Sequence, residues 1–161
     1  MATGQTRRWT GVVLMVGFFT LGMGGCGGSD SNPLSGLLGV EMTFDPAEAT
    51  ATASEVEGFE WSVVYQVTLQ ETGGEIGGVV TRFNVIVYEA NGGAPGVEVE
   101  SAESTVNAPN TRLAPGGTVQ AALETRYSLV NGGKAAFIDV TAFINDDAGL
   151  TGDITRRLTV Q

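Results

Sequence analysis

Residues 59–70, FEWSVVYQVTLQ, carry an apolar side chain at every odd position and a polar one at every even position except Val64. Successive side chains of an extended chain point to opposite faces, so this alternation predicts a β-strand with one buried face. The predicted buried residues are Phe59, Trp61, Val63, Tyr65, Val67 and Leu69. Aromatic and β-branched side chains also pack well on a half-buried pleated surface, which agrees with the alternation.

The same alternation recurs along the rest of the chain. Further strands are predicted at residues 37–44, 79–90, 97–100, 119–129, 136–144 and 154–160, separated by turns rich in Gly, Asn and Pro. The alanine- and threonine-rich stretch 47–56 is an ambiguous edge segment. Residues 107–117 form the longest irregular connection, which is expected where a chain crosses from one sheet to another.

Short strands with regularly spaced turns over residues 37–161, with no helical stretch, are typical of an antiparallel β-sandwich. With Trp61 in an early core strand and Tyr127 in a late one, this region resembles the immunoglobulin-like and fibronectin type III-like domains of bacterial exported proteins. The resemblance implies an immunoglobulin-like sandwich of seven to eight strands, without the cysteine pair of antibody domains. A small antiparallel barrel is the alternative architecture.

Residues 1–25 have the pattern of an export signal. Arg7 and Arg8 precede an apolar run from Val12 to Met23, which ends in small residues. A transmembrane helix needs about 20 predominantly apolar residues, so this run is short for a membrane span. The sequence therefore predicts that the protein is exported.

Residues 23–26, Met-Gly-Gly-Cys, resemble the lipobox of bacterial lipoproteins. The resemblance implies that Cys26, the one cysteine of the chain, is lipidated and becomes the mature N-terminus, with residues 26–36 as a flexible tether. It also implies membrane attachment through the lipid, and Gly27 after the cysteine implies sorting to the outer membrane. An ordinary secretory signal and a retained membrane anchor are the alternatives.

Composition narrows the function. The chain has no histidine and one cysteine, which removes Ser-His-Asp and Cys-His catalysis, thiolate zinc sites and an intrachain disulfide. The formal charge of -10 becomes -12 once the +2 of Arg7 and Arg8 is removed. Such an acidic domain repels nucleic-acid phosphates. We therefore expect neither an enzyme nor a nucleic-acid-binding protein.

One loop contains residues that could bind calcium. Asp146, Asp147 and Asp153 fall within eight residues of a glycine-containing segment, and calcium takes six to eight oxygen ligands. The spacing differs from that of an EF-hand, and Asp also favours turns through local hydrogen bonds to the backbone. The alternatives are a calcium site and a simple turn, and no other cofactor is predicted.

Two aromatic residues lie opposite the predicted core face of their strand. Phe137 and Phe143 alternate with the apolar residues of the 136–144 segment, so they are candidates for an exposed partner-binding patch. Alternatively, a loop or the 47–56 segment covers them.

Taken together, the sequence predicts a lipid-anchored envelope protein, periplasmic or surface-facing, that acts as a non-catalytic binding or structural accessory module. Its expected partner is another envelope protein, held at an exposed strand edge or at the Phe137 and Phe143 face. The alternatives are a surface adhesin or glycan- or calcium-binding module, and a small carboxylate-dependent hydrolase.

Overall fold

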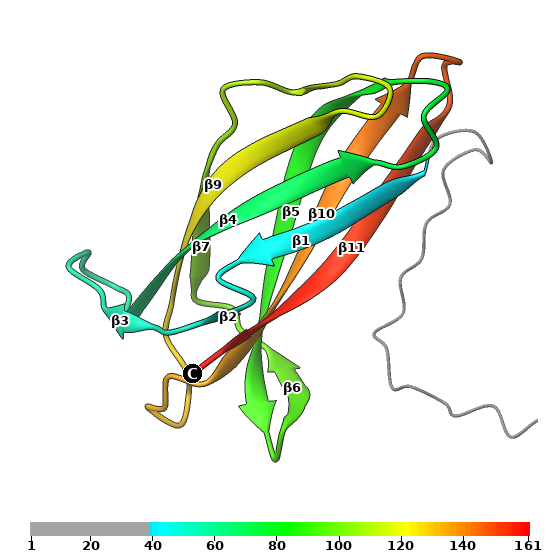
Figure 1. Ribbon diagram of the computed structural model, residues 1–161. Helices are drawn as coiled ribbons and strands as arrows, with labels where there is room; N and C mark the ends of the chain where they lie inside the picture. Colours follow the sequence, from blue (N-terminus) through cyan, green and yellow to red (C-terminus); the bar gives the residue numbers. More distant parts are fainter. Residues whose placement is uncertain (1–38) are drawn as a thin grey trace, which may run out of the picture.

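The computed structural model describes residues 39–161, which form eleven strands and no helix (Figure 1). The predicted export signal, Cys26 and the tether at 26–36 lie outside the described residues. Within 39–161 there is accordingly no helical segment with the length and apolar character needed to cross a membrane.

The strands belong to two sheets. The first has the order β1-β4-β9-β7, all antiparallel, with β3 also paired to β4. Its strands are β1 (Val40–Asp45), β3 (Thr52–Ala53), β4 (Trp61–Glu71), β7 (Ala102–Asn107) and β9 (Thr118–Tyr127). The second has the order β2-β11-β10-β5-β6, with β8 also paired to β5. Its strands are β2 (Glu48–Ala49), β5 (Gly78–Asn91), β6 (Ala94–Glu98), β8 (Arg112–Leu113), β10 (Ala136–Asp146) and β11 (Thr151–Val160).

This arrangement confirms the predicted immunoglobulin-like sandwich. The first sheet follows the order in which strands A, B, E and D neighbour one another in such domains, and β11, β10 and β5 correspond to G, F and C. Eight strands have five residues or more, and three, β2, β3 and β8, have two each. The ambiguous segment 47–56 supplies β2 and β3.

The core lies between the two sheets, where the predicted alternation is met. In β4 the side chains of Val63, Tyr65, Val67 and Leu69 are at most 2% exposed. Ile138, Val140 and Ile144 of β10 are buried in the same core. Trp61, at the start of β4, is half-buried, and its indole Nε1 has no hydrogen-bond partner within the described chain. Because alternating residues of both sheets are removed from water together, the sandwich buries a continuous apolar layer.

The chain crosses between the sheets within 107–117, as predicted, and also at a shorter connection. The chain leaves the second sheet at the end of β6 and enters the first at β7, so residues 99–101 make the shorter crossing. Residues 107–117 lead from β7 in the first sheet to β8 in the second and then to β9 in the first. Just before β8, the carbonyl of Thr111 accepts from Val80 N–H of β5 at 2.9 Å. The sequence analysis missed β7 because residues 102–107, AESTVN, show no clear apolar alternation.

Candidate partner-binding surface

The facing edges of β5 and β7 leave a gap along one long side of the sandwich. We call the space between the edges of β5 and β7 the open seam. The outer edge of β5 pairs with β8 at Gly78 and Val79 and with β6 from Tyr88 onward. Between these contacts no strand of the described chain pairs with this edge from Thr81 to Ile86. At about 3.3 Å per residue, this unpaired stretch is about 20 Å long.

Backbone groups of both strands point into the open seam. The carbonyl of Val87 accepts from the N–H of Val99 at 2.8 Å, on the side of β5 away from β10. Backbone direction alternates along a strand, so the N–H and C=O groups of Phe83 and Val85 point the same way. Just before β7, the carbonyl of Ser101 accepts from Ser128 N–H, next to the end of β9, at 3.1 Å. Because the direction alternates, the backbone N–H and C=O groups of Ala102 point away from β9.

The side chains along the open seam belong to the inner faces of the sheets. Phe83 and Val85 lie opposite Ala142 and Val140 on the core side of β10, yet both are only half-buried. Val106 of β7 has the same inward direction and is 43% exposed. Together they border a groove of about 230 Å³ lined by Phe83, Asn84, Val85, Ala102, Ser104 and Val106. The seam thus exposes part of the sandwich interior.

A row of hydroxyls leads from this groove into the core. Ser104 Oγ lies 2.9 Å from Thr125 Oγ1, which lies 3.0 Å from the hydroxyl of Tyr65. The pKa of Tyr65 is raised to about 12, because burial raises it more than the hydrogen bond to Thr125 lowers it. The row is therefore uncharged at neutral pH and offers hydrogen bonds without adding charge to the groove.

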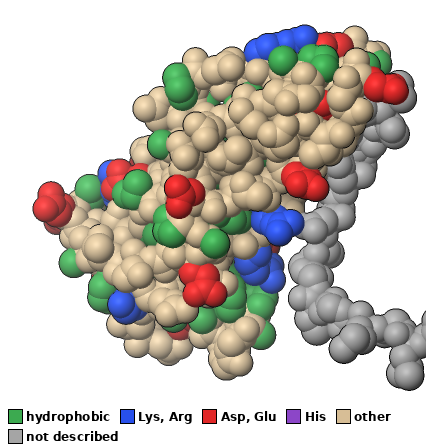
Figure 2. All heavy atoms as spheres, in the orientation of Figure 1, with side chains coloured by type: hydrophobic (Ala, Val, Ile, Leu, Met, Phe, Trp, Pro, Cys, Tyr) green, Lys and Arg blue, Asp and Glu red, His purple; other side chains and the backbone are tan. Residues whose placement is uncertain are grey.

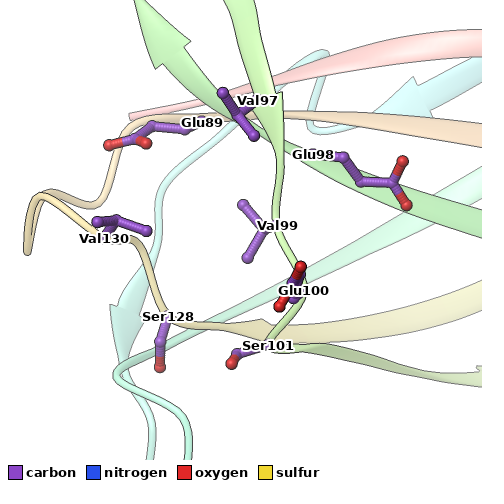
Figure 3. A pocket seen from close by; sticks show the side chains of 8 residues that line it. All are labelled: Glu89, Val97, Glu98, Val99, Glu100, Ser101, Ser128 and Val130. Atoms are coloured by element: carbon purple, nitrogen blue, oxygen red, sulfur yellow. The ribbon is translucent and has the colours of Figure 1, made fainter.

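A second cavity, which we call the end pocket, lies beyond the 99–101 crossover and has a volume of about 280 Å³ (Figure 3). It is lined by Glu89, Val97, Glu98, Val99, Glu100, Ser101, Ser128 and Val130. Val97 is 76% exposed and Val130 is 96% exposed. In Figure 3 the side chain of Glu98 points away from Glu89 and Val130. Asn131 Nδ2 donates to Glu89 Oε1.

The predicted calcium residues have separate surroundings. Asp146 is 5% exposed and its Oδ1 accepts from Leu150 N–H at 2.8 Å, which closes the turn after β10. Asp147 pairs with both terminal nitrogens of Arg112, at 2.5 and 2.7 Å, and this lowers the pKa of Asp147. Asp153 lies opposite Phe143, on the outer face of the second sheet. Across residues 39–161 no three His, Cys, Asp or Glu side chains are grouped so that they could hold a metal ion.

Phe137 and Phe143 lie on the outer face of the second sheet, as expected, and both are half-buried. Arginine side chains of the two neighbouring strands lie over their rings. The guanidinium of Arg82 lies 4.0 Å from the Phe143 ring centre, and that of Arg157 lies 5.9 Å from the ring centre of Phe137. Arg157 is itself held by Asp139 at 2.6 Å. Cationic side chains thus cover part of the predicted apolar patch.

Glu71 is a buried carboxylate that the sequence analysis missed. It is 1% exposed and accepts backbone N–H bonds from Gly73, Gly74 and Gly116 at 2.6 to 3.0 Å. Burial alone would raise the pKa of Glu71, but these bonds and one from Gly39 lower it overall. The carboxylate therefore connects three separate chain segments. A glutamate two residues before the Gly73-Gly74 turn was the available signal, whereas its contact with Gly116 joins residues 45 positions apart.

The surface charge is dispersed. Figure 2 shows acidic side chains spread singly over the face in view. Ion pairs within residues 39–161 include Arg112 with Asp147, Arg126 with Glu124, and Arg157 with Asp139.

In comparisons with known proteins, no protein-family model and no curated protein sequence matches this chain.

Proposed function

We propose that this chain is an exported, lipid-anchored protein of the bacterial cell envelope that works as a non-catalytic binding module. Anchoring is supported by the lipobox-like residues 23–26, the single Cys26 and the polar tether that follows. The binding role is supported by the open seam. In this proposal the partner is another envelope protein, which contributes an extended segment to the edge of β5.

The observation that carries the binding role is the unpaired stretch of β5 from Thr81 to Ile86. An added strand would accept and donate backbone hydrogen bonds along an edge that is otherwise left to water. Alternate side chains of that strand would enter the groove beside Phe83, Val85 and Val106. Backbone pairing would supply affinity, and the groove would select apolar side chains.

A labelled peptide tests this proposal. The probe is an N-acetylated, C-amidated hexapeptide of alternating Thr and Val, followed by fluorescence anisotropy with the intact domain. We expect binding by the wild type and a loss of at least about tenfold with Val106→Lys, because a charge would then point into the groove. A probe with methylated backbone nitrogens cannot donate backbone hydrogen bonds. It should therefore bind the wild type no more tightly than the unmethylated probe binds Val106→Lys.

Val56→Lys is the matched control. Val56 is 40% exposed, close to the 43% of Val106, and it lies between β3 and β4, away from the residues that line the groove. It should bind the probe as the wild type does. Equal binding by the wild type and Val106→Lys, or no binding by either, would reject strand addition at the open seam.

Anchoring and orientation need a separate test in cells. Cys26→Ser should abolish metabolic labelling with a fatty-acid analogue and release the protein from the membrane fraction. Digestion of the domain by protease added to intact cells would place it outside the cell, whereas protection until lysis would place it in the periplasm. Unchanged membrane association of Cys26→Ser would reject the lipid anchor.

The end pocket favours a second candidate function, the carboxylate-dependent hydrolase. Glu89 and Glu100 both line one concave pocket, and paired carboxylates are the machinery of glycoside hydrolysis. Hydrolysis of nitrophenyl glycosides that disappears in Glu89→Gln and in Glu100→Gln would support it. The glycan-binding alternative receives no such support from Trp61, whose half-buried side chain is packed against the core.

A further inference from the structure

We infer that the segment bound in the open seam carries a lysine or arginine at its N-terminal end, held beside the 99–101 crossover. This inference rests on the proposed function and specifies the chemistry of the partner. It combines three features of the structure, which are the direction of β5, the distribution of charge along the seam, and the apolar walls of the end pocket.

The direction of β5 sets which end of the partner meets the crossover. β5 runs from Gly78 to Asn91, and Val99 is hydrogen-bonded to Val87 near its far end. An antiparallel partner strand, the more stable pairing, would begin beside Ile86 and end beside Thr81. Its first residues would therefore lie next to the crossover and the end pocket.

Charge differs between the two ends of the open seam. Glu98, Glu100 and Glu103 lie on the crossover or next to it, all are exposed, and within the described chain none of them forms an ion pair. At the opposite end lie Arg82, over the ring of Phe143, and the Arg112 and Asp147 pair, which is neutral as a unit. A partner strand with its positive charge at the N-terminal end complements this difference.

The walls of the end pocket suit a long basic side chain. Val97, Val99 and Val130 line it together with the glutamates, and Val97 and Val130 are largely exposed. Lysine and arginine have an apolar stem and a charged head, so the stem can cover exposed valines while the head stays near carboxylates and water. A short or purely apolar residue would leave either the valines or the carboxylates without a partner.

Three hexapeptide probes test the inference by fluorescence anisotropy, all acetylated and amidated so that the termini carry no charge. The first has lysine at its N-terminal end, the second has lysine at its C-terminal end, and the third has uncharged norleucine at its N-terminal end. We expect the first to bind about five- to tenfold more tightly than either of the others. Raising the salt concentration to about 0.5 M should reduce this preference, because exposed charges are screened.

A charge-neutralising pair of substitutions identifies the groups responsible. Glu98→Gln with Glu100→Gln should remove the preference for the first probe and leave binding of the norleucine probe unchanged. Glu41→Gln with Glu75→Gln, which removes two exposed carboxylates elsewhere, should keep the preference.

The outcomes separate this inference from the proposed function. Equal affinities for all three probes, with binding still sensitive to Val106→Lys, would overturn the basic anchor and keep strand addition. Tighter binding of the C-terminal lysine probe would also overturn the inference, because the orientation would be reversed. Binding that ignores Val106→Lys would reject the proposed function itself.

Discussion

The two long sides of the sandwich differ in how their strand edges are covered. On the side opposite the open seam, the chain passes from β1 in the first sheet to β2 in the second, where β2 pairs with β11. Ala49 accepts from Gln161 N–H at 2.9 Å, and Ala51 N–H donates to Gln161 at 3.0 Å. Ala49 is 1% exposed. The segment from β1 to β2 thus connects the two sheets at one end of this side, where it pairs with Thr159 and Val160 of β11. On the other side, the 99–101 crossover lies near one end of β5, and no strand pairs with Thr81 to Ile86.

Arg156 adds a second difference. Ile154 and Leu158, two residues before and after it on β11, are buried, so Arg156 has the inward direction although it is exposed. It lines the groove between β1 and β11. Inward-pointing charges on outer strands discourage pairing with other chains. The side chains lining the open seam are uncharged. The two sides thus differ mainly in their lining, because one carries an inward-pointing charge that discourages an added strand and the other does not.

Substituting lysine on each side should give the largest difference in stability. Ala49→Lys would place a charge where the wild-type side chain is 1% exposed, and should lower the free energy of unfolding by about 3 kcal/mol or more. Val106→Lys at the open seam should cost less than about 1 kcal/mol, because its charge can reach water. Urea denaturation measures both. Similar losses for the two variants would show that the open seam is as tightly closed as the other side.

Glu71 should give an intermediate effect that depends on pH. Glu71→Gln weakens the hydrogen bonds that the carboxylate accepts from backbone N–H groups. The substitution should lower the free energy of unfolding by about 2 kcal/mol at pH 7. Folding lowers the pKa of Glu71, so the carboxylate stabilises the fold at pH values above 4.5, the ordinary pKa of a glutamate. This contribution is lost as the pH falls through the lowered pKa.

Melting curves of wild type and Glu71→Gln from pH 7 to pH 2 check this sign. The difference in melting temperature should be full near neutral pH and should shrink in acid. Glu75→Gln, an exposed neighbour, is the control and should follow the wild type throughout. A difference that grows as the pH falls would contradict a lowered pKa.

The smallest effect is expected on the outer face of the second sheet, away from both sides. Arg157→Ala removes the pair with Asp139 and the cover over Phe137, and should cost about 0.5 to 1 kcal/mol, less at high salt. The hexapeptide of alternating Thr and Val should bind this variant as it binds the wild type. Weakened binding would extend the binding surface from the open seam to the outer face.

Sequence reasoning worked where the information is local. The strands, their buried residues and the inward direction of Phe83, Val85 and Val87 follow from alternation, which the pleat of a strand dictates. It could not reveal which edges remain unpaired, because that depends on where β6 and β8 meet β5. It also could not show that Arg112 pairs with Asp147, since 35 positions separate them. The covering of Phe143 depends likewise on Arg82, from a neighbouring strand.

The carboxylate of Glu71 has a mechanical consequence. Gly39 is the first described residue, its carbonyl accepts from Thr72 N–H at 2.9 Å, and its own N–H contributes to lowering the pKa of Glu71. If the chain is tethered through its N-terminus, tension from the tether enters the domain at this residue. The load then passes through one carboxylate to the segments at 73–74 and 116 as well as to β1. In a tethered chain, these bonds would reinforce the start of the domain against peeling of the first strand.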